Sequence, residues 1–221
     1  MQRIRITHFS DALCVWAYVS QIRIDELVRK FPDAVEIDIR YVHVFGNVPG
    51  KIETGWKDRG GVRGYGEHVR EVAARFDHVT LHPEAWLRAT PASSMPAHLL
   101  LCAVRLLDAE RGSRELPRAA WALREAFFAH AADISRGDVL LGVCERLGLE
   151  VPAIEARIAS GAAHAALSED IDLARTQGVQ ASPTLLFNEG RQRLTGNVGY
   201  RIIEANIREL LESDPNQLSW C

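Results

Sequence analysis

Strand-like segments occur only near the two ends of this 221-residue chain, and a long helical pattern separates them. Near the start, residues 3–9 alternate charged and apolar side chains, and residues 35–45 are rich in β-branched and aromatic ones. Between them, residues 15–31 place apolar residues at helical spacing. This order predicts a strand–helix–strand unit with parallel strands and a right-handed crossover.

The other end of the chain predicts a hairpin followed by a helix. Residues 184–187 and 192–195 are short strand patterns around an Asn-Glu-Gly turn, and residues 199–212 carry one apolar stripe. Each end is too small to fold alone, so we expect both ends to share one sheet. The predicted fold class is α/β, with a discontinuous domain of residues 1–50 and 178–214 and an inserted unit of residues 51–177.

The predicted insertion begins with a glycine-rich segment, Gly46 to Gly66, which we interpret as a long loop and a candidate lid over a site. An all-helical block follows it. The expected helices span residues 67–76, 94–111, 116–131, 136–147, 152–160 and 163–177.

Composition and charge narrow the function classes. The chain is 47% hydrophobic and 25% charged, with a net charge of −3, so it lacks the basic excess that a nucleic-acid partner requires. No apolar run reaches the roughly 18 residues of a membrane span, and residues 1–10 do not resemble a signal peptide. We therefore expect no nucleic-acid or membrane partner, and a cytoplasmic protein with reduced thiols.

The chain has four cysteines and no Cys-x-x-Cys motif, and the positions of the cysteines suggest different roles for them. Cys14 stands between a predicted strand and the first turn of a helix, where the helix dipole stabilises a thiolate and lowers its pKa. Cys102 and Cys144 lie in apolar helical stripes, which is typical of core cysteines, and Cys221 ends the chain. Cys14 is thus the candidate nucleophile, with a purely structural cysteine as the alternative.

Pro183 stands directly before a predicted strand, where a proline cannot donate to the ladder. A cis Ser182–Pro183 bond that presents the Ser182 backbone to a ligand explains it, and a plain trans proline is the alternative. Trp16 is a candidate contact residue or only part of the core. His78 and His82 lack a third ligand nearby, so we expect no metal site.

The helix-start cysteine, the helical insertion and the Ser182-Pro183-Thr184 entry to the last hairpin resemble the thioredoxin superfamily. More narrowly they resemble its DsbA-like branch, which includes FrnE-type proteins, 2-hydroxychromene-2-carboxylate isomerases and kappa-class glutathione transferases. Asp11, Cys14, Trp16 and Tyr18 fit that branch's pattern near the start. The segment FFAHAADISRGDVLLGVCERLGLE resembles its helical stretch. The resemblance implies a thioredoxin-like fold with a large all-helical insertion.

Ala17 stands where the redox members of this branch have a second cysteine, and Val15 replaces their usual proline. The resemblance therefore implies a monothiol enzyme, with no tightly bound cofactor. An external thiol such as glutathione would serve as co-substrate and resolve the mixed disulfide. The expected substrate is a small thiol or a disulfide-containing molecule.

The resemblance also assigns the substrate-binding residues. Kappa-class and isomerase members bind glutathione against the residue before the cis-proline and near the start of the last helix, and a helix start favours a carboxylate. The matching positions here are Ser182 and Thr195-Gly196-Asn197, and the predicted substrate-binding residues are Trp16, Ser182, Pro183, Thr184, Gly196 and Asn197. Members of the kappa type carry a Ser-Asp-like pair at the last turn, which Asn197 fits only in part.

Three functions stay open at the level of sequence. The first is a monothiol DsbA-like thiol–disulfide oxidoreductase with Cys14 as nucleophile. The second is a glutathione-dependent transferase or isomerase, and the third is a degenerate thioredoxin-like binding module. The sequence does not fix the oligomeric state, and a homodimer remains one of the alternatives.

Overall fold

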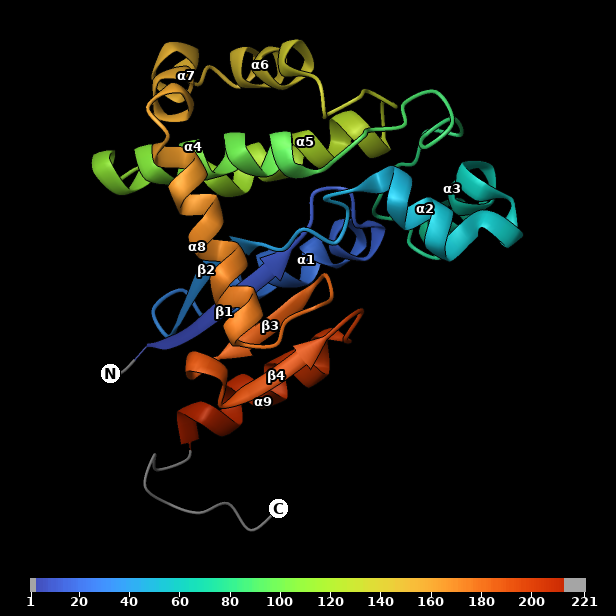
Figure 1. Ribbon diagram of the computed structural model, residues 1–221. Helices are drawn as coiled ribbons and strands as arrows, with labels where there is room; N and C mark the ends of the chain where they lie inside the picture. Colours follow the sequence, from blue (N-terminus) through green and yellow to red (C-terminus); the bar gives the residue numbers. More distant parts are fainter. Residues whose placement is uncertain (1–2, 213–221) are drawn as a thin grey trace.

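Both ends of the chain contribute strands to one four-stranded sheet in the computed structural model, which describes residues 3–212 (Figure 1). The strand order is β2 (Val35–Tyr41), β1 (Ile4–Ser10), β3 (Thr184–Phe187) and β4 (Gln192–Thr195). β1 pairs parallel with β2, while β3 lies antiparallel to both β1 and β4. The predicted α/β class with its shared sheet is confirmed.

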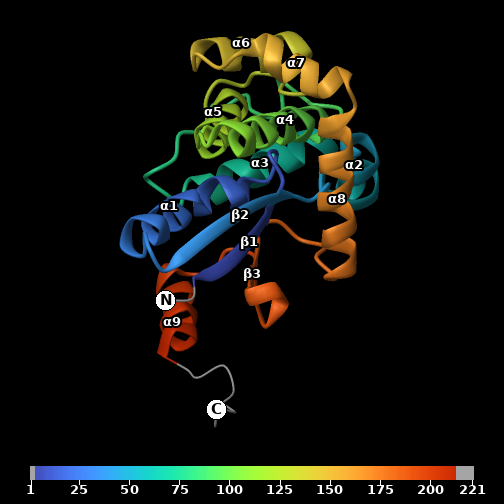
Figure 2. The same ribbon diagram turned by 90° about the vertical axis from the view of Figure 1, so that its left-hand side faces the viewer.

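Helices cover both faces of this sheet, because side chains alternate along each strand. Ile6 and Phe187 are buried on one face with residues of α1 (Val15–Lys30) and α9 (Tyr200–Glu212). Phe9 and Leu186 are buried on the other face with Ala174 of α8 (Ala162–Thr176). Figure 2 shows α8 running from the helical block down along the sheet.

The helical block lies at one end of the sheet and packs directly on the start of α1. It contains α4 (Met95–Arg111), α5 (Leu116–Phe128), α6 (Gly137–Arg146) and α7 (Val151–Ala159), close to the predicted helices. One buried apolar cluster includes Leu101 of α4, Phe127 of α5 and both Leu13 and Cys14. The block therefore forms one wall around the predicted nucleophile.

The predicted loop and lid at Gly46–Gly66 are wrong. The segment forms helix α2 (Val48–Trp56), a short 3₁₀ turn (Lys57–Arg59) and the first part of α3 (Gly61–Ala73). Gly64 allows close packing, because a Cβ there would lie 1.8 Å from the Arg59 carbonyl oxygen, and Gly60 and Gly61 adopt positive φ values. Asn47 caps α2 by accepting a hydrogen bond from the Gly50 amide at 3.1 Å. The glycine pattern thus marks a tight helical pair.

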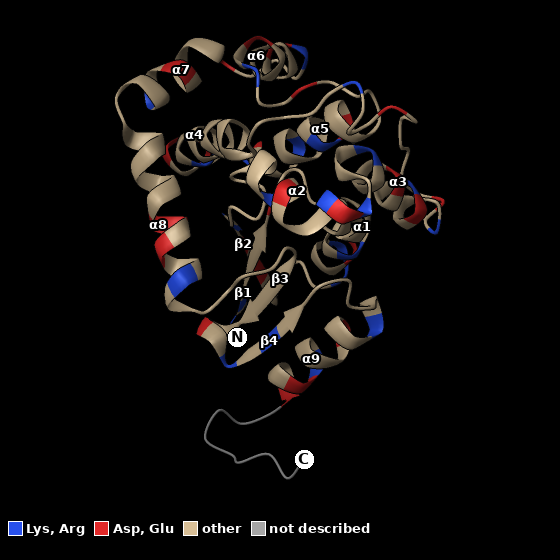
Figure 3. Ribbon diagram, turned by 45° about the vertical axis from the view of Figure 1, so that its right-hand side comes forward, with Lys and Arg blue, Asp and Glu red and all other residues tan. Residues whose placement is uncertain are grey.

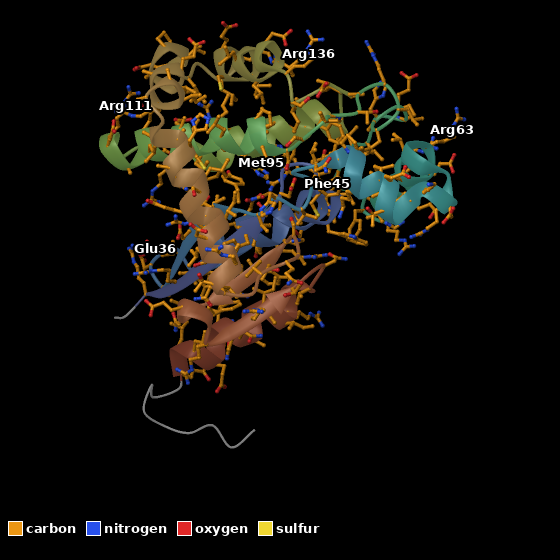
Figure 4. All side chains as sticks on the ribbon, viewed as in Figure 1. Glu36, Phe45, Arg63, Met95, Arg111 and Arg136 are labelled. Atoms are coloured by element: carbon orange, nitrogen blue, oxygen red, sulfur yellow. The ribbon has the colours of Figure 1, made fainter. Side chains whose placement is uncertain are left out.

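The second strand ends at Tyr41, four residues earlier than predicted. The following residues leave the sheet because the Phe45 amide donates to the Asp11 carboxylate (2.8 Å) and the Phe45 carbonyl accepts from the Ser94 amide (2.9 Å). Figure 4 shows Phe45 near Met95, where the sheet end meets the helical block. Two segments far apart in the chain are joined there.

A buried carboxylate on α8 fastens that helix to the sheet and to α4. Asp170, which is fully buried, accepts from Arg40 of β2 at 3.0 Å and from Arg105 of α4 at 2.8 Å. It also accepts from the Tyr41 amide at 3.1 Å. Asp170 therefore ties three elements together at a single point.

Charged residues of both signs are interspersed along the helices (Figure 3). The view shows basic and acidic segments side by side on α8 and α9. Among residues 3–212, the helices are all too short or too polar to cross a bilayer.

Candidate functional site

Cys14 is the residue immediately before α1, in extended backbone conformation. The turn after β1 places it there: the Cys14 amide donates to the Asp11 carbonyl at 3.1 Å, and the Cys14 carbonyl accepts from the Tyr18 amide at 3.1 Å. Its side chain is only 5% exposed. The sequence prediction of a cysteine at a helix start is thus met, with the thiol more enclosed than expected.

The loop that contains Pro183 faces this thiol. The Ser182–Pro183 peptide bond is cis, and the Cys14 Sγ donates to the Ser182 carbonyl at 3.1 Å. The Ser182 Oγ accepts from the Asp11 amide at 2.8 Å. Thr184, the first residue of β3, donates its hydroxyl to the Ala181 carbonyl at 3.0 Å and so closes the turn. Cys14, Ser182, Pro183 and Thr184 are therefore brought together.

The Asp11 carboxylate accepts hydrogen bonds from several segments around the site. One carboxylate oxygen accepts from the Leu13 amide at 2.9 Å, and the other accepts from the Phe45 amide at 2.8 Å and the Ser94 hydroxyl at 2.9 Å. On α4, His98 accepts from the Ala12 amide through Nε2 at 3.0 Å. Sequence reasoning missed Ser94 and His98, because no local pattern on α4 signals a partner more than 80 residues away.

Burial raises the pKa of the Cys14 thiol, and the negative charge of Asp11 acts in the same direction. Hydrogen bonds from the Ser182 side chain and from the first amides of α1 favour the thiolate, but they do not outweigh the loss of hydration. The expectation of a lowered pKa at this helix start is therefore wrong. A helix dipole lowers a thiol pKa only where desolvation does not dominate.

Gly196 and Asn197 occupy the turn before α9, next to the cis-proline loop. The Gly196 amide donates to the Pro183 carbonyl at 2.8 Å. Arg23 of α1 donates to the Asn197 side chain and, at 3.0 Å, to the Val198 carbonyl. Sequence reasoning missed Arg23, a cation beside the turn expected to hold a carboxylate. Its role becomes visible only from the structure, where α1 contacts this turn.

Comparison with known proteins agrees with this geometry. The family model described as a DSBA-like thioredoxin domain matches residues 5–208. The chain belongs to the DsbA-like thioredoxin family.

A curated relative, the ClpXP adapter protein SpxH of Halalkalibacterium halodurans, is 26% identical over 227 residues, which covers 97% of this chain and 70% of that protein. Among solved structures, the cytosolic disulfide reductase DsbM of Pseudomonas aeruginosa superposes with a TM-score of 0.68 at 16% identity, over 92% of this chain and 98% of that one. DsbM has also been solved with GSH, with a TM-score of 0.66. A 2-hydroxychromene-2-carboxylate isomerase gives 0.64 at 15% identity, over 94% and 96% of the two chains. These structures share the fold.

This DsbA-like domain has no second thiol beside Cys14 in the part of the chain that the structure describes. Ala17 is fully buried one turn into α1. Cys102 and Cys144 are free, buried thiols on α4 and α6, and burial raises their pKa values to about 12 and about 11. The predicted tail cysteine, Cys221, lies outside the described residues. Among residues 3–212 no group of three or more His, Cys, Asp or Glu side chains forms a metal site.

Trp16 lies half-buried near the start of α1, against the cluster that α1 shares with the helical block. A groove of about 360 Å³ opens between residues 42–44 after β2 and the end of α8. Its lining is mainly apolar, with His43, Arg175 and Gln180 as the polar members. Gln180 is two residues before Ser182, so this groove adjoins the loop that faces Cys14.

Proposed function

We propose that this DsbA-like domain is a thiol–disulfide oxidoreductase of monothiol type, with Cys14 as its nucleophile. The observation that carries the proposal is the 3.1 Å contact of the Cys14 Sγ with the Ser182 carbonyl beside a cis-proline. A substrate that lies along the Ser182 backbone, in the manner of an added strand, would bring its sulfur next to Cys14. Trp16, two residues after Cys14, and Thr184, two residues after Ser182, are the proposed contact residues for that substrate.

The proposed reaction balances with one external thiol. The Cys14 thiolate attacks one sulfur of a substrate disulfide, forms a mixed disulfide and releases the other sulfur as a thiolate. Because Ala17 cannot resolve this bond, glutathione attacks the mixed disulfide instead. Cys14 is regenerated, and the substrate half leaves as a mixed disulfide with glutathione. The reacting group is a side chain of the protein, so a DsbA-like domain needs no tightly bound cofactor.

The turn before α9 supports glutathione as that thiol. Free amides at a helix start attract a carboxylate, and Arg23 adds a positive charge beside Asn197. DsbM, which shares this fold, has been solved with GSH. We place the substrate in the adjoining groove next to Gln180 and the whole reaction in the cytoplasm, where glutathione is abundant and thiols stay reduced.

The proposal is tested with a model disulfide, reduced glutathione and peptide-resolved mass spectrometry. Wild-type protein is expected to form a mixed disulfide at Cys14 and to reduce the substrate catalytically. Cys14→Ser is expected to lose both activities, while Cys144→Ser, at a buried position on α6, keeps them. Equal turnover by wild type and Cys14→Ser would overturn the proposal.

A glutathione-dependent transferase or isomerase is a second candidate, favoured by the Arg23–Asn197 contact at the carboxylate position. In that case glutathione is a cofactor rather than a resolving thiol. Calorimetry tests the glutathione site that this candidate requires, where binding survives Cys14→Ser and is lost in Arg23→Gln. Turnover that also survives Cys14→Ser separates this candidate from the first. The absence of any glutathione binding eliminates it.

A binding module without catalysis is the third candidate. It is favoured by the enclosed, high-pKa thiol and the missing second cysteine, and the relative SpxH is named as an adapter. Under this interpretation Cys14→Ser preserves every function of the protein in the cell. A loss of function on that substitution would exclude it.

A further inference from the structure

Arg124 on α5 is a buried cation without an anionic partner among the described residues. Its side chain is 2% exposed, yet none of the carboxylates in residues 3–212 lies within ion-pairing distance of it. It donates only to two neutral oxygens, the Ser10 Oγ at 2.9 Å and the Gln21 Oε1 at 3.2 Å, and its Nε has no partner. Buried charges are otherwise paired, since an isolated one is costly.

The position of Arg124 connects the helical block with the candidate site. Ser10 is the last residue of β1, directly before the Asp11–Cys14 turn, and Gln21 lies two turns along α1 from Cys14. The guanidinium is therefore fixed where β1 ends and α1 begins. Six titratable groups at the end of β1, in and before α1, at the end of β2 and on α4 interact electrostatically with it: His8, Asp11, Cys14, Asp25, Tyr41 and His98.

Only Cys14 and Asp11 can supply buried negative charge to this cation. Burial keeps His8 and His98 neutral by lowering their pKa values, and it keeps Tyr41 neutral by raising its pKa. Asp25 is exposed and solvated. Without Arg124, ionisation of Cys14 would place a second buried negative charge near Asp11 with no cation to offset it. Tyr65 of α3, which also interacts with Cys14, stays protonated because burial raises its pKa.

We infer that Arg124 is the buried positive charge that allows Cys14 to exist as a thiolate in this enclosed site. It is a positioning residue, since it acts through the electrostatic field at the start of α1 and not by touching a substrate. The inference deepens the proposed function, because it names the group in the helical block that activates the nucleophile.

Two substitutions isolate the charge from the packing. Arg124→Lys and Arg124→Gln both remove the guanidinium fork, but only Gln removes the charge. The rate of alkylation of Cys14 by iodoacetamide is followed against pH, using the tryptic peptide that contains Cys14. Arg124→Gln is expected to raise the Cys14 pKa by about one unit over Arg124→Lys, which slows alkylation at pH 8 about tenfold. Arg118→Gln, at an exposed arginine of the same helix, is the control and leaves the titration unchanged.

A third variant tests the inference if Arg124→Gln does not fold. Gln21→Glu places a carboxylate at the oxygen that Arg124 already contacts, so the cation is neutralised where it stands. The Cys14 pKa is expected to rise in this variant too. Equal titration curves for Lys and Gln at position 124, or an unchanged curve in Gln21→Glu, would overturn the inference. Alkylation needs no disulfide turnover, so a wild type inactive in exchange would remove the proposed function and leave this result standing.

Discussion

Single residues hold the site together across long stretches of chain, and Asp11 is the clearest case. Its carboxylate accepts from the start of α1, from the segment after β2 and from α4, while its charge raises the pKa of Cys14. Asp11 and Cys14 could be predicted as site residues from the sequence because both stand at a helix start. Ser94, His98 and Arg124 could not, because polar residues inside helices are usually solvated and only the fold buries these.

We predict that Asp11→Asn changes stability and reactivity in opposite directions. The amide replaces one acceptor oxygen by a donor, so either the Leu13 amide or the Phe45 amide loses its acceptor, at a cost of about 1–3 kcal/mol in unfolding free energy. Removal of the negative charge lowers the Cys14 pKa at the same time. Urea unfolding and the pH profile of Cys14 alkylation measure the two effects. A variant with an unchanged Cys14 pKa would show that Asp11 acts only as a structural anchor.

Ala17→Cys tests whether the site can perform dithiol chemistry. The new thiol would lie one turn into α1 from Cys14, and because Ala17 is fully buried the extra sulfur costs about 1 kcal/mol or more through overpacking. We expect higher insulin-reduction activity with dithiothreitol than in wild type. Ala103→Cys, at another fully buried alanine on α4, is the matched control and should give no gain. Equal rates in all three proteins would mean that the site does not support a resolving thiol.

At the scale of elements, composition misled the prediction at α2 and α3 and at the end of β2. Helix boundaries from α4 to α9 lie within a few residues of those predicted, because apolar periodicity and end signals agree there. Gly46–Gly66 was predicted as a loop, since glycine weakens helices. The close approach of Gly64 to Arg59 and of Gly66 to Trp86, and the positive φ of Gly60 and Gly61, explain four of these glycines, and such tertiary contacts have no local signature.

The attachment of α8 depends on Asp170, so this carboxylate should dominate the stability of that element. Asp170→Asn leaves Arg40 and Arg105 without their shared anion, and we expect a loss of about 3–5 kcal/mol in unfolding free energy. Asp172→Asn breaks only the exposed pair with Arg175 and should cost less than about 1 kcal/mol. Urea denaturation of both variants measures the difference. Similar losses for the two would mean that α8 is held by its apolar face alone.

For the whole molecule, buried neutral histidines link stability to pH. The pKa of His8 is lowered to about 3 by burial and by Arg124, and that of His98 is lowered by burial. Below their ordinary value of 6.5, the unfolded chain binds protons that the folded chain does not, so stability falls as the pH drops from 6.5 towards the folded values. At pH 5 the loss from His8 alone is about 2 kcal/mol.

Urea unfolding at pH 7 and pH 5 checks this dependence, which His8→Leu should reduce by about 2 kcal/mol. His130→Gln, at an exposed histidine, should leave it unchanged. A His8→Leu variant with the full wild-type pH dependence would show that other groups, such as carboxylates, cause the acid sensitivity.

The contact between Cys14 and Ser182 joins residues 168 positions apart, which has a consequence during protein synthesis. At roughly 5–20 residues per second, the ribosome needs on the order of ten seconds or more to extend the chain from one residue to the other. Until then the cis-proline loop cannot enclose the thiol, although α5 with Arg124 is synthesised earlier. For that time the nascent chain carries an ordinary exposed cysteine, which is open to oxidants and to mixed disulfides, and the last strands to emerge shield it.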